Sequence, residues 1–151
     1  GKVLNKNKPS SEILLHLGIY RNHKDIGAIV HSHSKWASIL SCMRISIPSF
    51  HYMVAEFGGN NIKCSKYATF GSEKLSKYVN KVLHNRKGCL IANHGQVTIA
   101  NSLEEAIDLS IALEKLCEQY YYLWISKKTR LLSDQEMRKI VKLFEDYKAK
   151  H

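Results

Sequence analysis

Two histidines separated by one residue are the first side chains in the sequence whose types and spacing could do chemistry. The segment 28–33 reads AIVHSH, which predicts a short buried strand that ends in His31 and His33. Side chains two apart on a strand point to the same face, with about 6.6 Å between their backbones. Two imidazoles on that face can reach one metal ion at bond lengths of about 2.0–2.1 Å. The H-x-H spacing is weak by itself, and a pair of surface or core histidines would show the same pattern.

His94 is a third candidate ligand, within the tripeptide Asn93-His94-Gly95 between two apolar segments. Gly95 allows the backbone to turn sharply, so an imidazole next to it can be held in a defined place. Three histidine ligands with an open fourth position are typical of catalytic zinc, and imidazole suits zinc or a similar divalent ion. The alternative is that His94 is an ordinary turn residue.

Polar residues near the N-terminus form a second group of candidates. Ser10, Ser11 and Glu12 follow Pro9 at the expected start of a helix. Serines and acidic residues are common there as caps and as partners of the helix dipole. The same start could instead bind a phosphate through backbone N–H groups and two hydroxyls. Tyr52 could donate a proton to an oxyanion beside a metal, or be a half-buried aromatic residue.

The elements that must position these residues are helices alternating with short strands. Helices are expected from just after Pro9, capped by Ser10 or Ser11, to before Arg21, and over 34–43, 72–83, 102–126 and from 133 onward. Ile13, Leu14 and Leu17 would form the apolar face of the first helix. Strands are expected over 28–33, near 62–64, and over 89–92 and 97–100. Capping boxes at residues 102–105 and 133–136 mark two helix starts. The alternation predicts an α/β fold.

Composition limits the class of protein. The 151 residues are 44% hydrophobic, enough for one domain with a buried core, and no apolar run is long enough to cross a membrane. The four cysteines form no C-x-x-C pair, which favours reduced thiols and a cytoplasmic location. The net charge is +10, yet the basic residues are scattered over every expected element. We therefore predict no nucleic-acid or membrane partner, and a charge that attracts phosphorylated metabolites.

Seven short segments occur in the same order as in class II aldolases, which the chain resembles over nearly its whole length. They are 9–12 (PSSE), 30–33 (VHSH), 47–53 (IPSFHYM), 58–60 (GGN), 67–71 (YATFG), 85–87 (NRK) and 93–95 (NHG). The likeness is to the class II aldolase and adducin family, and within it chiefly to L-fuculose-1-phosphate aldolases. It implies a three-layer α/β/α fold with a central mixed, mostly antiparallel sheet, in a single domain over residues 1–151.

The resemblance also implies what the candidate residues do. His31, His33 and His94 would bind one zinc ion per chain, and other divalent metals could replace it. Glu12 would be the acid/base group and could occupy the fourth zinc position in the resting state. A further three residues would act on the substrate: Ser10 and Ser11 on its phosphate, and Tyr52 as a proton donor at or near a subunit interface of a homotetramer.

The implied activity is reversible retro-aldol cleavage of a ketose 1-phosphate to dihydroxyacetone phosphate and an aldehyde. Ribulose-phosphate 4-epimerase and methylthioribulose-phosphate dehydratase are alternatives, because the same metal site can serve all three reactions. Non-catalytic adducin-type domains have lost the metal histidines that this chain keeps, so an enzyme is favoured. Relatives carry an upstream Gly-Asn-Ser-type loop that completes the phosphate pocket, and this sequence is expected to lack it. Glu56 and Gln96 replace small or apolar residues, which predicts a different substrate preference.

Overall fold

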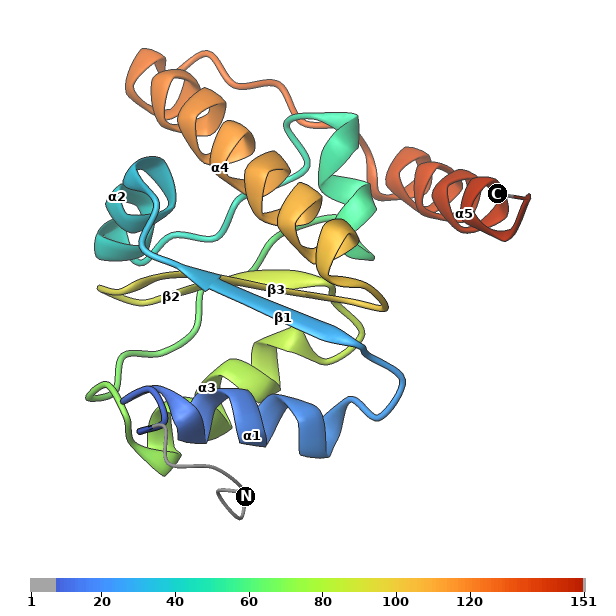
Figure 1. Cartoon of the computed structure of the whole chain (residues 1–151). Coiled ribbons are helices and arrows are strands. Elements are labelled where there is room, and N and C mark those ends of the chain that lie inside the picture. The colour runs from blue at the N-terminus through green and yellow to red at the C-terminus, as the bar shows by residue number, and fades with distance from the viewer. Residues whose placement is uncertain (1–7, 151) are drawn as a thin grey trace.

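The chain forms three layers, with a sheet between two pairs of helices (Figure 1). The structure is a computed structural model, and it describes residues 8–150. Helices α1 (Ile13–Asn22) and α3 (Glu73–Leu83) cover one face of the sheet, and α2 (Lys35–Met43) and α4 (Leu103–Ser126) cover the other. The expected three-layer α/β/α fold is confirmed.

Two further elements lie beside these layers. The 3-10 helix η1 (Tyr52–Phe57) packs against α5 (Asp134–Lys150), the red helix near the C-terminus in Figure 1. Within residues 8–150, no helix has both the length and the apolar character that a membrane span requires.

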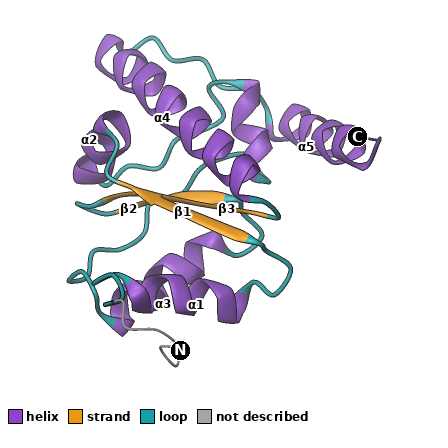
Figure 2. Ribbon diagram, viewed as in Figure 1, coloured by secondary structure: helices purple, strands orange, loops and turns teal. Residues whose placement is uncertain are grey.

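The sheet has three strands in the order β1-β3-β2, namely β1 (Ala28–Ser32), β2 (Gly88–Ile91) and β3 (Gly95–Ala100), shown in orange in Figure 2. Both pairings are antiparallel, with His31 opposite Val97. The strand expected near residues 62–64 is reduced to isolated bridges, Ile47 with Ile62 and Cys64 with Leu90. The Cys64 bridge is the one parallel pairing among the described residues, so the sheet is antiparallel and only slightly mixed.

A hydrophobic core fills each side of the sheet. Leu40, Leu113 and Phe57 belong to the core beneath α2 and α4, and Leu15 and Ile19 belong to the core beneath α1 and α3. All six residues of β3 are buried because helices cover both faces of this central strand.

The apolar face predicted for the first helix was wrong. In α1, the buried side chains are Leu15 and Ile19, whereas Ile13 and Leu14 are each 36% exposed. Positions four apart lie on one side of a helix, and α3 packs on that side.

Serine caps are present at the starts of three helices, and two of them, at Ser102 and Ser133, were expected. The hydroxyls of Ser72, Ser102 and Ser133 each accept a hydrogen bond from the backbone N–H three residues later. The expected cap of the first helix was wrong, because Glu12 occupies the N-cap position and makes no side-chain cap bond. Ser10 Oγ accepts instead from the N–H of Glu12, at 3.2 Å. The Glu12 carboxylate is therefore not used in capping.

The end of the first helix also differs from the prediction. The helix continues past Arg21 to Asn22, whose side-chain amide donates to the carbonyl of Gly18 at 2.7 Å. The last helical turn thus includes polar residues that the sequence placed outside the helix.

Candidate metal centre

The three candidate ligands meet at one end of the sheet. His31 lies near the end of β1, His33 follows that strand, and His94 lies in the turn between β2 and β3. One nitrogen from each ring lies within 4.8 Å of the other two. The Nε2 atoms of His31 and His33 are 3.1 Å apart. Tetrahedral zinc with bonds of about 2.0–2.1 Å would hold such atoms about 3.3 Å apart, so the arrangement fits zinc with small adjustments.

The turn that carries His94 is fixed by α2. The carbonyl of Ser41 accepts from the N–H of Asn93 at 2.9 Å, and its hydroxyl accepts from the N–H of His94 at 3.2 Å. The left-handed residue of this turn is Asn93, with φ of 53°. Gly95 is needed for a different reason, since a Cβ there would lie 2.3 Å from the carbonyl oxygen of Ser32. The expectation that Gly95 makes the sharp turn was therefore wrong: it permits a close approach of β1.

The orientation of His31 is set by the neighbouring strand. Its Nδ1 donates to the carbonyl oxygen of Gln96 at 2.8 Å. A carbonyl only accepts, so the proton lies on Nδ1 in the neutral ring and the lone pair of Nε2 faces His33. A hydrogen bond of this kind on the outer nitrogen is the usual support of a metal-binding histidine.

Burial favours the neutral form of His31 and His94, which is the form that binds metal. It lowers the pKa of His31, an effect that the Gln96 carbonyl and the Glu12 carboxylate partly oppose and that His94 and His33 reinforce. It also lowers the pKa of His94, again with partial opposition from Glu12. Both rings are therefore neutral near pH 7.

Glu12 is placed beside the histidines as a buried carboxylate. Its side chain is only 8% exposed, and its Oε2 has no hydrogen-bond partner among the described residues. Its charge acts on His94 and His31, and also on His16 one helical turn further along α1. Burying an unpartnered carboxylate oxygen is costly. A cation held by the three imidazoles would supply the missing partner, so this donor set fits a divalent metal.

A cavity of about 410 Å³ opens onto these groups. Its walls combine polar and aromatic side chains: Ser11, Glu12, His33, Tyr67, Ala68, Phe70, Asn93 and His94. Tyr67 and Phe70 are 52% and 66% exposed. Both lie in the family-like segment 67–71, but neither was predicted to have a role.

Arg44 brings a positive charge to this region and was also missed. Its Nε donates to Asn93 Oδ1 at 2.7 Å, and its guanidinium carbon lies 5.6 Å from the centre of the Tyr67 ring. An isolated arginine after a predicted helix carries no local signal of such contacts.

Tyr52 is not brought to the histidine cavity of its own chain. Its ring stacks on His51, with centroids 4.9 Å apart, and is nearly parallel to Phe144 at 6.5 Å. It is 52% exposed and lines an apolar groove of about 440 Å³ between η1 and α5, which also contains Ile140, Leu143, Phe144 and Tyr147. We call this the Tyr52 groove.

Ser11 lines the histidine cavity, whereas Ser10 does not. Ser10 is exposed just before α1, and its Oγ accepts from the N–H of Glu12. Neither Glu56 nor Gln96 lines the histidine cavity. Gln96 is fully buried, and its side-chain amide donates to Ser34 Oγ at 2.8 Å and to the carbonyl of Ser110 at 3.2 Å. Its side chain therefore supports the fold around the site.

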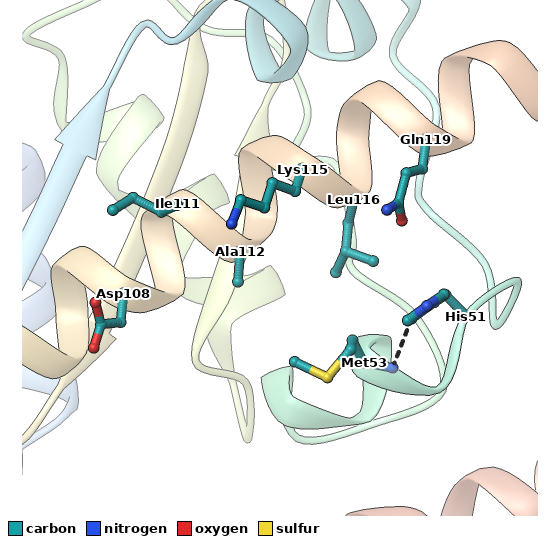
Figure 3. Close-up of a pocket in the computed structure, with 8 residues that line it drawn as sticks. All are labelled: His51, Met53, Asp108, Ile111, Ala112, Lys115, Leu116 and Gln119. Atoms are coloured by element: carbon teal, nitrogen blue, oxygen red, sulfur yellow. Dashed lines mark hydrogen bonds between the residues drawn. The ribbon is translucent and has the colours of Figure 1, made fainter.

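A separate cavity of about 300 Å³ lies between η1 and α4 (Figure 3). His51 and Met53 form one side, and residues of α4, including Leu116 and Gln119, form the other. His51 Nδ1 accepts from the N–H of Met53 at 3.2 Å, so this histidine acts as a local cap. The cavity contains none of the three clustered histidines.

Comparisons with known proteins place the chain in one family. The model of the family described as Class II Aldolase and Adducin N-terminal domain matches residues 1–121. A 5-methylthioribulose-1-phosphate/5-deoxyribulose-1-phosphate aldolase of Rhodospirillum rubrum is 38% identical over 147 residues, which are 97% of this chain and 66% of the relative. An L-fuculose phosphate aldolase of Escherichia coli strain K12 is 38% identical over 148 residues, 97% of this chain and 69% of the relative.

A solved L-fuculose 1-phosphate aldolase superposes with a TM-score of 0.90 at 32% identity, over 95% of this chain and 67% of that one. The chain thus spans about two thirds of the length of the curated relatives that it matches.

Proposed function

The chain belongs to the class II aldolase and adducin N-terminal domain family, and on that premise we propose that it is a zinc-dependent sugar-phosphate aldolase. The reaction is reversible cleavage of a ketose 1-phosphate to dihydroxyacetone phosphate and an aldehyde. One observation carries this proposal: three imidazole nitrogens converge within 4.8 Å beside a buried carboxylate oxygen that has no hydrogen-bond partner among the described residues.

His31, His33 and His94 would hold the zinc ion and leave a fourth position open, as in catalytic sites. When bound, zinc supplies a Lewis acid that stabilises negative charge on the ketose oxygens, so no Schiff-base lysine is required. Consistent with this, the described residues that line the cavity include no lysine.

Glu12 is proposed to move the proton at the substrate carbon. In the direction of synthesis, it removes a proton from the carbon of dihydroxyacetone phosphate next to the carbonyl group, and in cleavage it returns it. Its Oε2 has no hydrogen-bond partner within the described residues, so it can take up a proton without breaking a hydrogen bond. In the absence of substrate, the same oxygen could occupy the fourth zinc position.

Ser10 and Ser11 are proposed to bind the substrate phosphate at the start of α1. Ser11 lines the cavity, and Ser10 is an exposed neighbour whose hydroxyl hydrogen remains available, because its oxygen acts as the acceptor toward Glu12. Backbone N–H groups of the first helical turn and the helix dipole favour an anion there.

Tyr52 is proposed to protonate the aldehyde oxygen in the site of a neighbouring chain. It lies outside its own histidine cavity, in the Tyr52 groove, where Leu143 and Tyr147 are each 65% exposed. Exposed apolar residues also follow one another along α4, at Leu103, Ile107 and Ile111. Exposed apolar patches of this kind mark surfaces for association. We therefore infer a homo-oligomer, a tetramer as in the family, and a cytoplasmic location in keeping with its four free cysteines.

The proposed substrate carries a phosphate at carbon 1 and a small apolar group at its other end. The curated relatives are named for 5-methylthioribulose 1-phosphate, 5-deoxyribulose 1-phosphate and fuculose phosphate. The exposed rings of Tyr67 and Phe70 give this cavity an apolar opening suited to a methyl or methylthio group.

Elemental analysis of the purified chain beside His94→Ala is the first test. About one zinc per chain, absent from the variant, supports the three-histidine site. Incubation with ketose 1-phosphates then separates the reactions: dihydroxyacetone phosphate with an aldehyde indicates an aldolase, an inverted sugar indicates an epimerase, and loss of water indicates a dehydratase. No metal in either protein after dialysis against zinc would contradict the proposal and favour a non-catalytic, adducin-like domain.

A further inference from the structure

A carboxylate on α4 holds the start of α2, the helix that follows His33. Glu114 accepts three hydrogen bonds there: from Ser34 Oγ at 2.5 Å, from the N–H of Trp36 at 2.7 Å and from the N–H of Ala37 at 2.9 Å. Ser34 occupies the N-cap position but makes no side-chain bond to its own helix. Glu114 therefore supplies the cap that Ser34 does not, from a residue distant in sequence, and its charge strengthens the bonds.

The same bonds continue to the metal-ligand candidate His31. Ser34 Oγ also accepts from the side-chain amide of Gln96 at 2.8 Å. The backbone carbonyl of Gln96 accepts from His31 Nδ1 at 2.8 Å. A connected series thus runs from Glu114 through Ser34 and Gln96 to His31.

The other end of α2 holds the third histidine. Ser41 accepts from the N–H groups of Asn93 and His94, and Arg44 donates to the Asn93 side chain. Helix α2 therefore begins just after His33 and ends at the turn that carries His94. A shift of this one helix would move ligands on two separate segments.

We propose that Glu114 is a positioning residue for the metal centre. By fixing α2, and by orienting Ser34 and Gln96, it keeps the three imidazoles at the separation that zinc requires. Glu114 does not line the histidine cavity, so it acts through other residues. This inference rests on the proposed zinc site, and it follows the general finding that groups supporting metal ligands change affinity by about 10- to 100-fold.

The test compares zinc binding by the full chain with that of Glu114→Ala, Glu114→Gln and the control Ser102→Ala. Ser102 caps the start of α4 through the N–H of Glu105, so the control removes a helix cap without touching α2. Zinc affinity is measured by competition with a chromophoric chelator, and the unfolding temperature is measured on the metal-free proteins. The absorption spectrum of the Co²⁺ forms reports the ligand geometry.

We expect Glu114→Ala to weaken zinc binding by about 10- to 100-fold and to alter the Co²⁺ spectrum. Glu114→Gln should weaken it less, because its amide oxygen still accepts while its NH₂ group cannot. Ser102→Ala should lower the unfolding temperature and leave zinc affinity unchanged.

Unchanged zinc affinity in both Glu114 variants would overturn the inference while leaving the proposed function standing. Equal weakening by Ser102→Ala would also overturn it, since the effect would then follow general stability. If Glu114→Ala does not fold, Glu114→Gln decides. A wild-type chain that binds no zinc would overturn the proposed function and this inference together.

Discussion

The histidine cavity and the Tyr52 groove are built in opposite ways. The cavity joins the start of α1, the end of β1 and the turn after β2. Hydrogen bonds that Gln96 and Ser41 accept hold His31 and His94 in place. The Tyr52 groove lies between η1 and α5, and its lining is almost wholly apolar. Ring stacking on His51 and Phe144 is what orients Tyr52.

This difference indicates which part of the chemistry one chain can supply by itself. Convergent polar groups with fixed orientation can bind a metal within a single chain. An exposed apolar groove gains free energy only when another surface covers it. Metal and base therefore belong to one chain in our proposal, and the proton donor faces outward to another. The following experiments test this division, from the largest expected effect to the smallest.

His94→Ala should remove metal and activity together. Two histidines remain, and loss of one of three protein ligands should weaken zinc binding by more than about 100-fold, beyond the effect of a supporting residue. Elemental analysis and an assay for aldehyde release measure both quantities. His84→Ala, at an exposed histidine after α3, is the control and should keep its zinc. A zinc-loaded His94→Ala would contradict the three-histidine site.

Glu12→Gln should separate binding from turnover. The three imidazoles still hold zinc, but an amide cannot accept the substrate proton, so kcat should fall by about 10³-fold. The measurement pairs zinc content with steady-state kinetics on a ketose 1-phosphate. Near-normal turnover would assign the acid/base role to another residue.

Tyr52→Phe should lower kcat by about 10²-fold and leave zinc content unchanged. The phenyl ring keeps its packing on His51 and Phe144, so only the hydroxyl is lost.

Mixing this variant with Glu12→Gln shows where Tyr52 acts. If Tyr52 serves a neighbouring chain, mixed assemblies contain sites with both an intact Glu12 and an intact Tyr52, and activity returns. If it acts within its own chain, every site lacks one group and mixing restores nothing.

Leu143→Glu should have the smallest effect on the stability of the single chain and should instead weaken association between chains. Leu143 is 65% exposed, so the charge should change the stability of the isolated chain by no more than about 0.5 kcal/mol. Within a covered groove the same charge opposes association. Analytical ultracentrifugation should show smaller assemblies, with zinc retained. Gln135→Glu adds the same charge elsewhere on α5 and serves as the control. An unaltered assembly would show that the groove is not an interface.

Local features of the sequence determined much of the fold. Helices α3 and α4 follow from apolar spacing and from Ser72 and Ser102, because a cap bonds to a residue only three positions away. The two-residue repeat of a strand predicted that His31 and His33 share one face, although the strand expected over 28–33 ends at Ser32 and His33 follows it. The weakly patterned first helix was the poorest prediction, in its cap, its apolar face and its end.

Tertiary structure alone decided how the site is assembled. Strand pairing and the contact with α2 bring His94 to His31, and the close approach of β1 decides the role of Gly95. The hydrogen bonds of Glu114 and Gln96 join segments far apart in sequence, and no local pattern encodes them. The sequence by itself determined the ligand types and their local spacing, since these depend on near neighbours. Their convergence depends on chain topology, which only the packed layers fix.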